Sequence, residues 1–451
     1  MEFESHPSSK SLTIEDALER TGTGWASISL SILVLFISSL DSSEFKTLGV
    51  LKTTATDENV RELSVETLAA ALTVGQIVSL FVTMLMTDKV GRRVFILVGL
   101  GITALADFIT ALSWGFGMNL STRFLAGLGT GLASLTAFHL LAECLGSKWR
   151  SRLLVVVATG ALTLGPAIVD LISAVVGWRQ LQMVLGTLTL ILLVIAYYSM
   201  LESPRVLVNM RKCAEASDVC RKIAASNGVT NLQISSVSEK QSLVENGSLK
   251  DLFSASLWPA SRLLIILYLL AGFSSAKIVT RQQDDDELSR LVLQLVGAVI
   301  ACVFSYFADP RTKSTIASWL YVVSSVCLTF VLILQRLQSQ GTILLMGLSN
   351  LFLFIGLAFN LTYTVELVST EIRGSAHSLL LIIFKVSCLS SIFLEVKSED
   401  IVLVAILLLM AISSALLPAV QSDSLDALSR SFKLNWSLDE ADEEAHLLAL
   451  R

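Results

Sequence analysis

Charged residues are scarce in this chain. Of its 451 residues only 16% are charged, whereas 53% are hydrophobic. A soluble globular domain carries about 25% charged residues, because its surface has to face water. The composition therefore excludes an ordinary soluble protein and favours a protein that is largely surrounded by lipid.

Cysteine and the common catalytic motifs are also sparse. The chain has six cysteines, and the two nearest in sequence, Cys213 and Cys220, are separated by more residues than a zinc motif allows. No phosphate-binding Gly-Lys-Ser/Thr loop and no nucleophile motif occurs in the sequence. We therefore expect no enzyme activity, metal, cofactor or nucleic-acid partner.

Long apolar runs, by contrast, recur along the chain. Twelve of them approach the ~20 residues that a helix needs to cross a hydrocarbon core, and these lengths suit helices rather than barrel strands. The runs cover residues 25–40, 67–87, 94–114, 119–141, 153–176, 180–200, 260–279, 290–308, 315–334, 342–365, 376–394 and 401–419. The sequence therefore predicts an all-α membrane protein with twelve transmembrane helices.

The loops between these runs predict an orientation and a domain organisation. Loops that lie on the side of the N-terminus hold more lysine and arginine than loops on the other side, which places both termini in the cytosol. We expect a cytosolic N-terminal segment, a six-helix bundle, a cytosolic linker, a second six-helix bundle and an acidic cytosolic tail. Their boundaries are 1–24, 25–201, 202–258, 259–419 and 420–451.

Two charge patterns occur twice, once in each half. Glu143 is followed by Arg150 and Glu366 by Arg373, seven positions on in each case, with an offset of 223 residues between the two copies. The stretch Asp88-Lys-Val-Gly-Arg-Arg93 has a degenerate copy that ends at Lys313. Many secondary transporters are built from a duplicated membrane half of this kind.

The same residues carry a family resemblance. Asp88–Arg93 resembles the loop between helices 2 and 3 of the major facilitator superfamily, and Arg123–Gly131 resembles its helix 4 motif. Glu202-Ser-Pro-Arg205 and the two Glu/Arg patterns are similar to the branch that contains sugar porters, organic-ion transporters and synaptic-vesicle glycoprotein-like proteins. Leu12–Gly24 is similar to the vesicle-protein relatives, and Ala214–Gly228 to the organic-ion transporters. The resemblance implies the major facilitator fold, with two six-helix pseudo-repeats.

The repeated charges predict a gate. All of them lie at the predicted cytosolic ends of helices, where partly desolvated ion pairs can break and form again as two bundles rock. Solvated loop charges that only mark the topology are the alternative interpretation. The predicted gating residues are Asp88, Arg92, Arg93, Glu143, Arg150, Glu366 and Arg373.

Lys385 predicts the charge of a substrate. It lies near the middle of the eleventh apolar run, where an ammonium group is costly unless it faces a cavity or an acidic partner. A matching position in organic-ion relatives tends to be basic in anion carriers, so the resemblance favours an organic anion. A structural ion pair with Asp107 or Asp170 is the alternative. We also expect Tyr363 and Asp170 to contact substrate, although Tyr363 is close enough to Glu366 to line the gate instead.

Two functional classes follow from these observations. One is a secondary transporter that moves a small organic ion or metabolite, with an anion favoured, by alternating access across the lipid bilayer. The other is a vesicle membrane protein that keeps the transporter fold and acts mainly in binding or trafficking, in a vesicle, endosomal or plasma membrane. The tail could carry an acidic dileucine signal for a vesicle-coat adaptor, or could form only an amphipathic helical turn. The residues of that signal are Glu443, Leu447 and Leu448.

Overall fold

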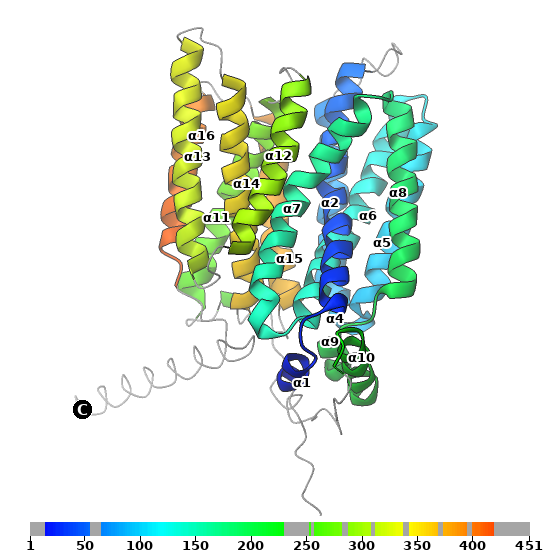
Figure 1. Cartoon of the computed structure of the whole chain (residues 1–451). Helices are drawn as coiled ribbons and strands as arrows, with labels where there is room; N and C mark the ends of the chain where they lie inside the picture. Colours follow the sequence, from blue (N-terminus) through cyan, green and yellow to red (C-terminus); the bar gives the residue numbers. More distant parts are fainter. Residues whose placement is uncertain are drawn as a thin grey trace, which may run out of the picture.

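The computed structural model has helices and no strand in the part of the chain that it describes (Figure 1). Two sets of six long helices follow one another, and three short helices accompany them. The described residues are 14–54, 65–229, 252–253, 257–281, 287–307, 312–336, 342–368, 373–394 and 399–418.

The twelve long helices form two halves. The first half consists of α2 (Trp25–Thr54), α4 (Val65–Val90), α5 (Arg92–Ala111), α6 (Phe116–Cys144), α7 (Ser147–Ser173) and α8 (Trp178–Ser199). The second half consists of α11 (Trp258–Arg281), α12 (Glu287–Phe307), α13 (Lys313–Arg336), α14 (Thr342–Leu367), α15 (Arg373–Phe393) and α16 (Glu399–Ala415). The short helices are α1 (Ile14–Arg20), α9 (Pro204–Asn209) and α10 (Cys213–Ser226).

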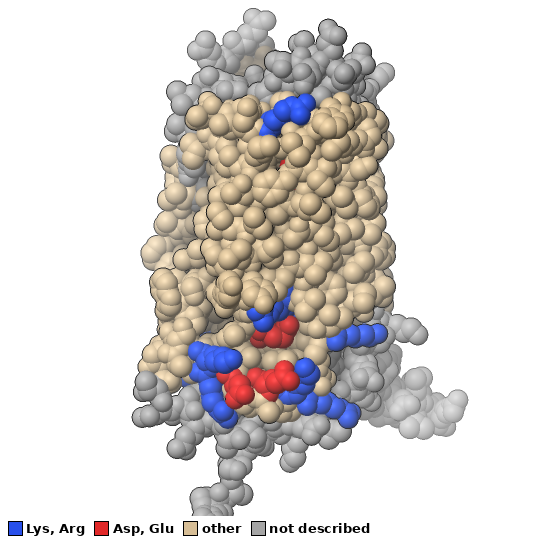
Figure 2. Space-filling view, turned by 90° about the vertical axis from the view of Figure 1, so that its right-hand side faces the viewer, with Lys and Arg blue, Asp and Glu red and all other residues tan. Residues whose placement is uncertain are grey.

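Most of the long helices are long and apolar enough to cross a membrane. Within the described residues, ten helices are long and apolar enough to cross a membrane, and Ile401–Ala415 forms a shorter apolar helix. Helices satisfy their own backbone hydrogen bonds, which lipid cannot do for them. Figure 2 shows one face on which the acidic and basic side chains of the described residues gather mainly at the lower end, below a broad band with few of them. These observations confirm the predicted all-α, multi-pass architecture.

The first long helix extends well beyond its predicted end. The apolar run 25–40 predicted a short helix, but α2 continues through Asp41, Glu44 and Lys46 to Thr54. Each of these three charged side chains has a partner of opposite charge inside the protein, so it does not end the helix. Their partners are Lys385, Arg123 and Asp170, respectively.

Glycine lets α4 and α6 touch through their backbones. A Cβ atom on Gly127 would lie 2.0 Å from the carbonyl oxygen of Leu72, and one on Gly75 would lie 2.1 Å from that of Phe124. Neither distance leaves room for a side chain. Small residues at such crossings allow dense helix packing in a membrane, where lipid gives no hydrophobic drive for helices to associate.

The two halves meet along two helix faces. From the first half, α4 packs against α15, and α7 packs against α12 and α14. Each half contributes most of one hydrophobic core, and each core also includes residues of the other half. The short helices α1, α9 and α10 gather at one end of the bundle, which we name the α1 end (Figure 1).

Candidate functional site

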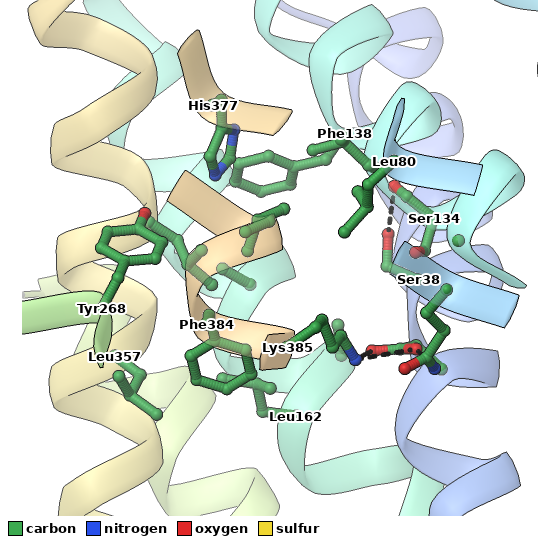
Figure 3. Close-up of a pocket in the computed structure, with 18 of the residues that line it drawn as sticks. Ser38, Leu80, Ser134, Phe138, Leu162, Tyr268, Leu357, His377, Phe384 and Lys385 are labelled. Atoms are coloured by element: carbon green, nitrogen blue, oxygen red, sulfur yellow. Dashed lines mark hydrogen bonds and ion pairs between the residues drawn. The ribbon is translucent and has the colours of Figure 1, made fainter. Parts of the chain in front are cut away.

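A central cavity lies between the two halves. Its volume is about 140 Å³, room for roughly ten water molecules at the ~10–15 Å³ that each requires. Most of its wall is aliphatic or aromatic, and its polar groups come from both halves (Figure 3). It is lined by Ser38, Asp41, Gln76, Leu80, Gly131, Ser134, Leu135, Phe138, Ala158, Ala161, Leu162, Leu267, Tyr268, Leu357, Asn360, Leu361, His377, Leu381, Phe384 and Lys385.

Lys385 provides a positive charge in the cavity wall. Its ammonium group lies 3.0 Å from Asp41, which belongs to the other half of the molecule (Figure 3). The Asp41 carboxylate also accepts a hydrogen bond from the amide of Gln76. Phe45 and Phe384 place their rings 5.1 and 5.9 Å from the ammonium nitrogen, where their faces attract a cation. Asp41 keeps 28% of its side chain exposed, so the pair can be reached from the cavity.

The other two predicted substrate residues lie elsewhere. Asp170 pairs with Lys46 at 3.2 Å inside the first half. Tyr363 is buried on α14, and its hydroxyl donates a hydrogen bond to the carbonyl oxygen of Pro418. Asn360 is the residue of α14 that brings a polar side chain to the cavity instead.

A second buried charge cluster links α2, α5 and α6. Arg123 lies 2.7 Å from Glu44 and donates a hydrogen bond to the hydroxyl of Thr47. The carboxyl of Asp107 is buried beside this pair and interacts electrostatically with both charged groups. Arg123 therefore holds helices of the first half together.

Glu143 pairs with Arg92 rather than with the arginine seven positions later. The guanidinium of Arg92 lies 3.1 Å from the Glu143 carboxylate, and each side chain is only 1% exposed. Glu202 also accepts a hydrogen bond from the backbone N–H of Arg92, at 2.8 Å, and so caps the start of α5. The pair joins α5 to α6 within the first half.

The second half repeats this arrangement and adds a contact to the first half. Glu366, at the end of α14, pairs with Lys313, at the start of α13. Lys313 and Glu366 follow Arg92 and Glu143 by 221 and 223 residues, so the duplicated patterns of the sequence form equivalent ion pairs. Ser151 on α7 donates a hydrogen bond to Glu366 and accepts one from Lys313 at 2.9 Å. This hydroxyl connects the second pair to the opposite half.

Arg150 contacts the N-terminal short helix. Its guanidinium lies 3.6 Å from Glu15 of α1, and the same carboxylate lies 3.2 Å from Arg205 of α9. One acidic side chain thus connects three helices at the α1 end. Electrostatic interaction with Glu366 also reaches Arg150 from the second half.

The remaining predicted gating residues hold helix ends. Arg373 donates hydrogen bonds to the carbonyl oxygens of Val365 and Val368, at 2.7 and 3.1 Å, and so caps the end of α14. Arg93 donates to the carbonyl oxygen of Tyr197. The side chain of Asp88 lies outside the described part of the chain. So do the predicted sorting residues Glu443, Leu447 and Leu448.

Three partners of these residues were not predicted from the sequence. Asp41 lies inside α2, and Lys313 and Glu15 lie at the starts of α13 and α1. Each meets a residue more than fifty positions away. Lys313 alone carried a signal, because it aligns with Arg92 at the offset of the repeated loop. The partners of Lys385 weighed from the sequence, Asp107 and Asp170, are both engaged with other groups.

The chain is similar in sequence to a known protein family and to known transporters. A family model described as Major Facilitator Superfamily matches residues 28–392. Among curated proteins, the 4-hydroxybenzoate transporter PcaK of Pseudomonas aeruginosa is 26% identical over 252 residues, which cover 54% of this chain and 55% of PcaK. Solute carrier family 22 member 3 of Mus musculus is 28% identical over 214 residues, 46% of this chain and 37% of that protein. The chain thus matches about half the length, or less, of these relatives.

A solved structure shares the fold over nearly its full length. XylE, described as a proton:xylose symporter bound to 6-bromo-6-deoxy-D-glucose, superposes with a TM-score of 0.66. The superposition covers 90% of this chain and 99% of XylE at 15% sequence identity. At that identity the likeness shows the twelve-helix fold and carries no information about the substrate.

Proposed function

The chain belongs to the Major Facilitator Superfamily, and we propose that it is a secondary transporter that moves a small organic anion through its central cavity by alternating access. The two halves would rock about the cavity, so that it opens to one side of the membrane and then to the other. In this proposal the α1 end faces the cytosol, in agreement with the lysine and arginine content of the loops.

The observation that carries the proposal is the ion pair between Lys385 and Asp41. It joins the two halves through side chains that line the cavity. A substrate carboxylate can take the place of Asp41 beside the ammonium group, because both are oxygen anions of the same charge. The exchange would release one half from the other and couple substrate binding to movement.

The cavity wall supports an anion with an apolar body. Nine of the twenty lining residues are leucine or phenylalanine, and Phe138 and Phe384 provide aromatic rings. Ligand sites of this type bury the hydrocarbon part of a molecule and orient it with a few polar groups. The 4-hydroxybenzoate in the name of the transporter PcaK is an aromatic carboxylate and has this chemistry.

Uptake into liposomes tests the proposal. The purified full chain would be reconstituted and supplied with 4-hydroxybenzoate or with 4-hydroxybenzylamine, a cation of nearly the same size and shape. We expect uptake of the anion by wild type. Loss of a charge-assisted hydrogen bond of ~1.5–3 kcal/mol in Lys385→Ala should weaken its apparent affinity by roughly tenfold or more.

Two further variants sharpen the result. Lys385→Asp should favour the cation, whereas Lys148→Ala, which removes an exposed lysine outside the cavity lining, should behave like wild type. A wild type that prefers the cation, or identical ranking of the two probes by all variants, would contradict the anion proposal. Binding of 4-hydroxybenzoate without uptake would favour the vesicle-protein alternative.

A further inference from the structure

Two histidines from opposite halves form a hydrogen bond that the proposed transport mechanism does not use. Nε2 of His139 on α6 lies 2.9 Å from Nδ1 of His377 on α15. The ring centroids are 5.1 Å apart with an angle of 44° between the planes. Both side chains are buried, with exposed fractions of 2% and 1%.

The pair lies between the central cavity and the gate charges. His377 lines the cavity, and Lys385 lies eight residues further along the same helix, about 12 Å away at 1.5 Å per residue (Figure 3). His139 precedes Glu143 by four residues, and Arg373 precedes His377 by four. Each imidazole is therefore one helical turn from a charged residue of the α1 end.

The charged groups beside the imidazoles are mostly positive. Arg92 of α5 and Arg373 of α15 interact electrostatically with His139, and Arg373 also acts on His377. Glu143, on the same helix as His139, is engaged by Arg92. From the adjoining α4, the hydroxyl of Thr83 lies 3.4 Å from that of Ser378, the residue after His377. The described groups thus include two guanidinium groups and one carboxylate that is already paired.

The hydrogen bond between two imidazoles depends on how many protons they hold. When both rings are neutral, one nitrogen donates and the other accepts. One added proton can be held without loss of this hydrogen bond, but it places a third positive charge near Arg92 and Arg373. A second added proton turns both facing nitrogens into donors, and the hydrogen bond is lost. Each added proton therefore favours separation of His139 from His377, and with it separation of the two halves.

We propose that His139 and His377 form a proton-binding site that holds the α1 end closed when neutral and releases it when protonated. Protons reach the site from the cavity side, where His377 forms part of the wall. Its Nε2 atom is buried and without a hydrogen-bond partner in the described structure. This nitrogen can accept a proton in the tautomer whose Nδ1–H donates to His139. The site would couple proton binding to the rocking that the proposed transport function requires. Only this coupling rests on the proposed transport function.

The test measures conformation and needs no substrate. Spin labels on Lys89→Cys and Thr312→Cys, exposed residues at the α1 ends of the first and second halves, would report the distance between the halves. The full chain, with its six native cysteines replaced, would be studied in lipid nanodiscs between pH 7.5 and 5.5. We expect the ratio of open to closed molecules to rise on acidification, by up to roughly tenfold per pH unit for each linked proton.

Glutamine variants isolate the imidazoles. His139→Gln or His377→Gln keeps a polar side chain that does not titrate, and each should reduce the change to less than about twofold over the whole range. The other two histidines of the chain, His6 and His446, supply the matched control, since His6→Ala/His446→Ala should respond like wild type. His377→Asn serves as a second variant if a glutamine variant does not elute as a folded protein in size exclusion.

Either of two results would overturn the proposal. A wild type whose label distances do not change with pH excludes a proton-linked contact without any variant. A glutamine or asparagine variant that keeps the full response assigns it to another group. Failure of 4-hydroxybenzoate uptake would leave these measurements unchanged, so the transport proposal and the proton proposal can fail separately.

Discussion

Arg92 and Glu143 form a buried ion pair that joins α5 to α6 near the α1 end. Their ion pair is 1% exposed on both sides, and Glu366 with Lys313 forms its counterpart in the second half. Burial makes these pairs sensitive to the loss of one member. A charge left alone in a buried site loses its hydration without gaining a partner.

Replacement of Glu143 should therefore be costly. We expect Glu143→Gln to destabilise the protein by about 3–5 kcal/mol, because the buried guanidinium of Arg92 would lose the carboxylate with which it pairs. The apparent Tm in detergent would be measured from the amount of protein that stays monodisperse after heating.

An exposed ion pair provides the matched control for this replacement. Glu215 pairs with Lys212 on α10, and both side chains are more than half exposed. Exposed pairs of this kind contribute ~0–1 kcal/mol, so Glu215→Gln should leave the apparent Tm nearly unchanged. Equal shifts for Glu143→Gln and Glu215→Gln would mean that the buried pair does not stabilise the fold.

The sequence predicted the helices better than it predicted which charged residues form ion pairs with each other. The charge patterns marked Arg92, Glu143 and Glu366 as important, but partners depend on which helices meet in space. Lys385 and Asp41 are 344 positions apart, and neither periodicity nor spacing relates residues at such a separation. The sequence could show that Lys385 needed a partner or a cavity, and the structure supplies both.

At the scale of elements, length and glycine content determine the helices and their approach. Apolar runs located the twelve long helices, because a membrane helix is defined by length and apolarity. The exception, α2, continues past Asp41 because its charged residues face partners inside the protein. The end of an apolar run does not predict the end of such a helix. The sequence does not show whether the next charged residue is buried in the protein or lies in a loop.

The contact between α4 and α6 gives a prediction for glycine. Gly127→Ala would place its Cβ atom against the backbone of Leu72, and overpacking of this kind costs about 1–3 kcal/mol. Backbone cannot rotate away as a flexible side chain can, so α4 and α6 would have to move apart. We expect a lower apparent Tm and a lower yield of folded protein.

A glycine on the neighbouring helix serves as the control for this substitution. A Cβ atom on Gly101 of α5 would have no heavy atom within 4 Å. Gly101→Ala should be neutral or slightly stabilising, because alanine has the better helix propensity. If Gly101→Ala were the more harmful of the two, close approach would not be the reason for the glycine at position 127.

At the scale of the whole molecule, polar contacts join the halves both at the α1 end and across the cavity. Ser151 joins α7 to the Lys313–Glu366 pair, and His139 meets His377. Lys385 and Asp41 meet across the cavity itself. Duplicated patterns in the sequence predicted the two halves, and the family resemblance predicted their fold. The position of the halves relative to each other could not be predicted from the sequence, because every conformational state of a protein has the same sequence.

Covalent closure of the α1 end should stop transport. The hydroxyls of Thr83 on α4 and Ser378 on α15 lie 3.4 Å apart and belong to opposite halves, so Thr83→Cys/Ser378→Cys should form a disulfide under mild oxidation. We expect oxidation to reduce liposome uptake of 4-hydroxybenzoate at least tenfold, because the halves could no longer separate at this point. Reduction with dithiothreitol should restore uptake.

Binding distinguishes a lock from simple damage. A protein held closed at the α1 end should still bind 4-hydroxybenzoate at Lys385 from the opposite side, so its affinity in detergent should stay within about threefold of wild type. Each single cysteine variant, treated with the same oxidant, should transport normally. Undiminished uptake by the cross-linked protein would show that α4 and α15 stay together during transport, and the movement would then have to be sought at the contact of α7 with α12 and α14.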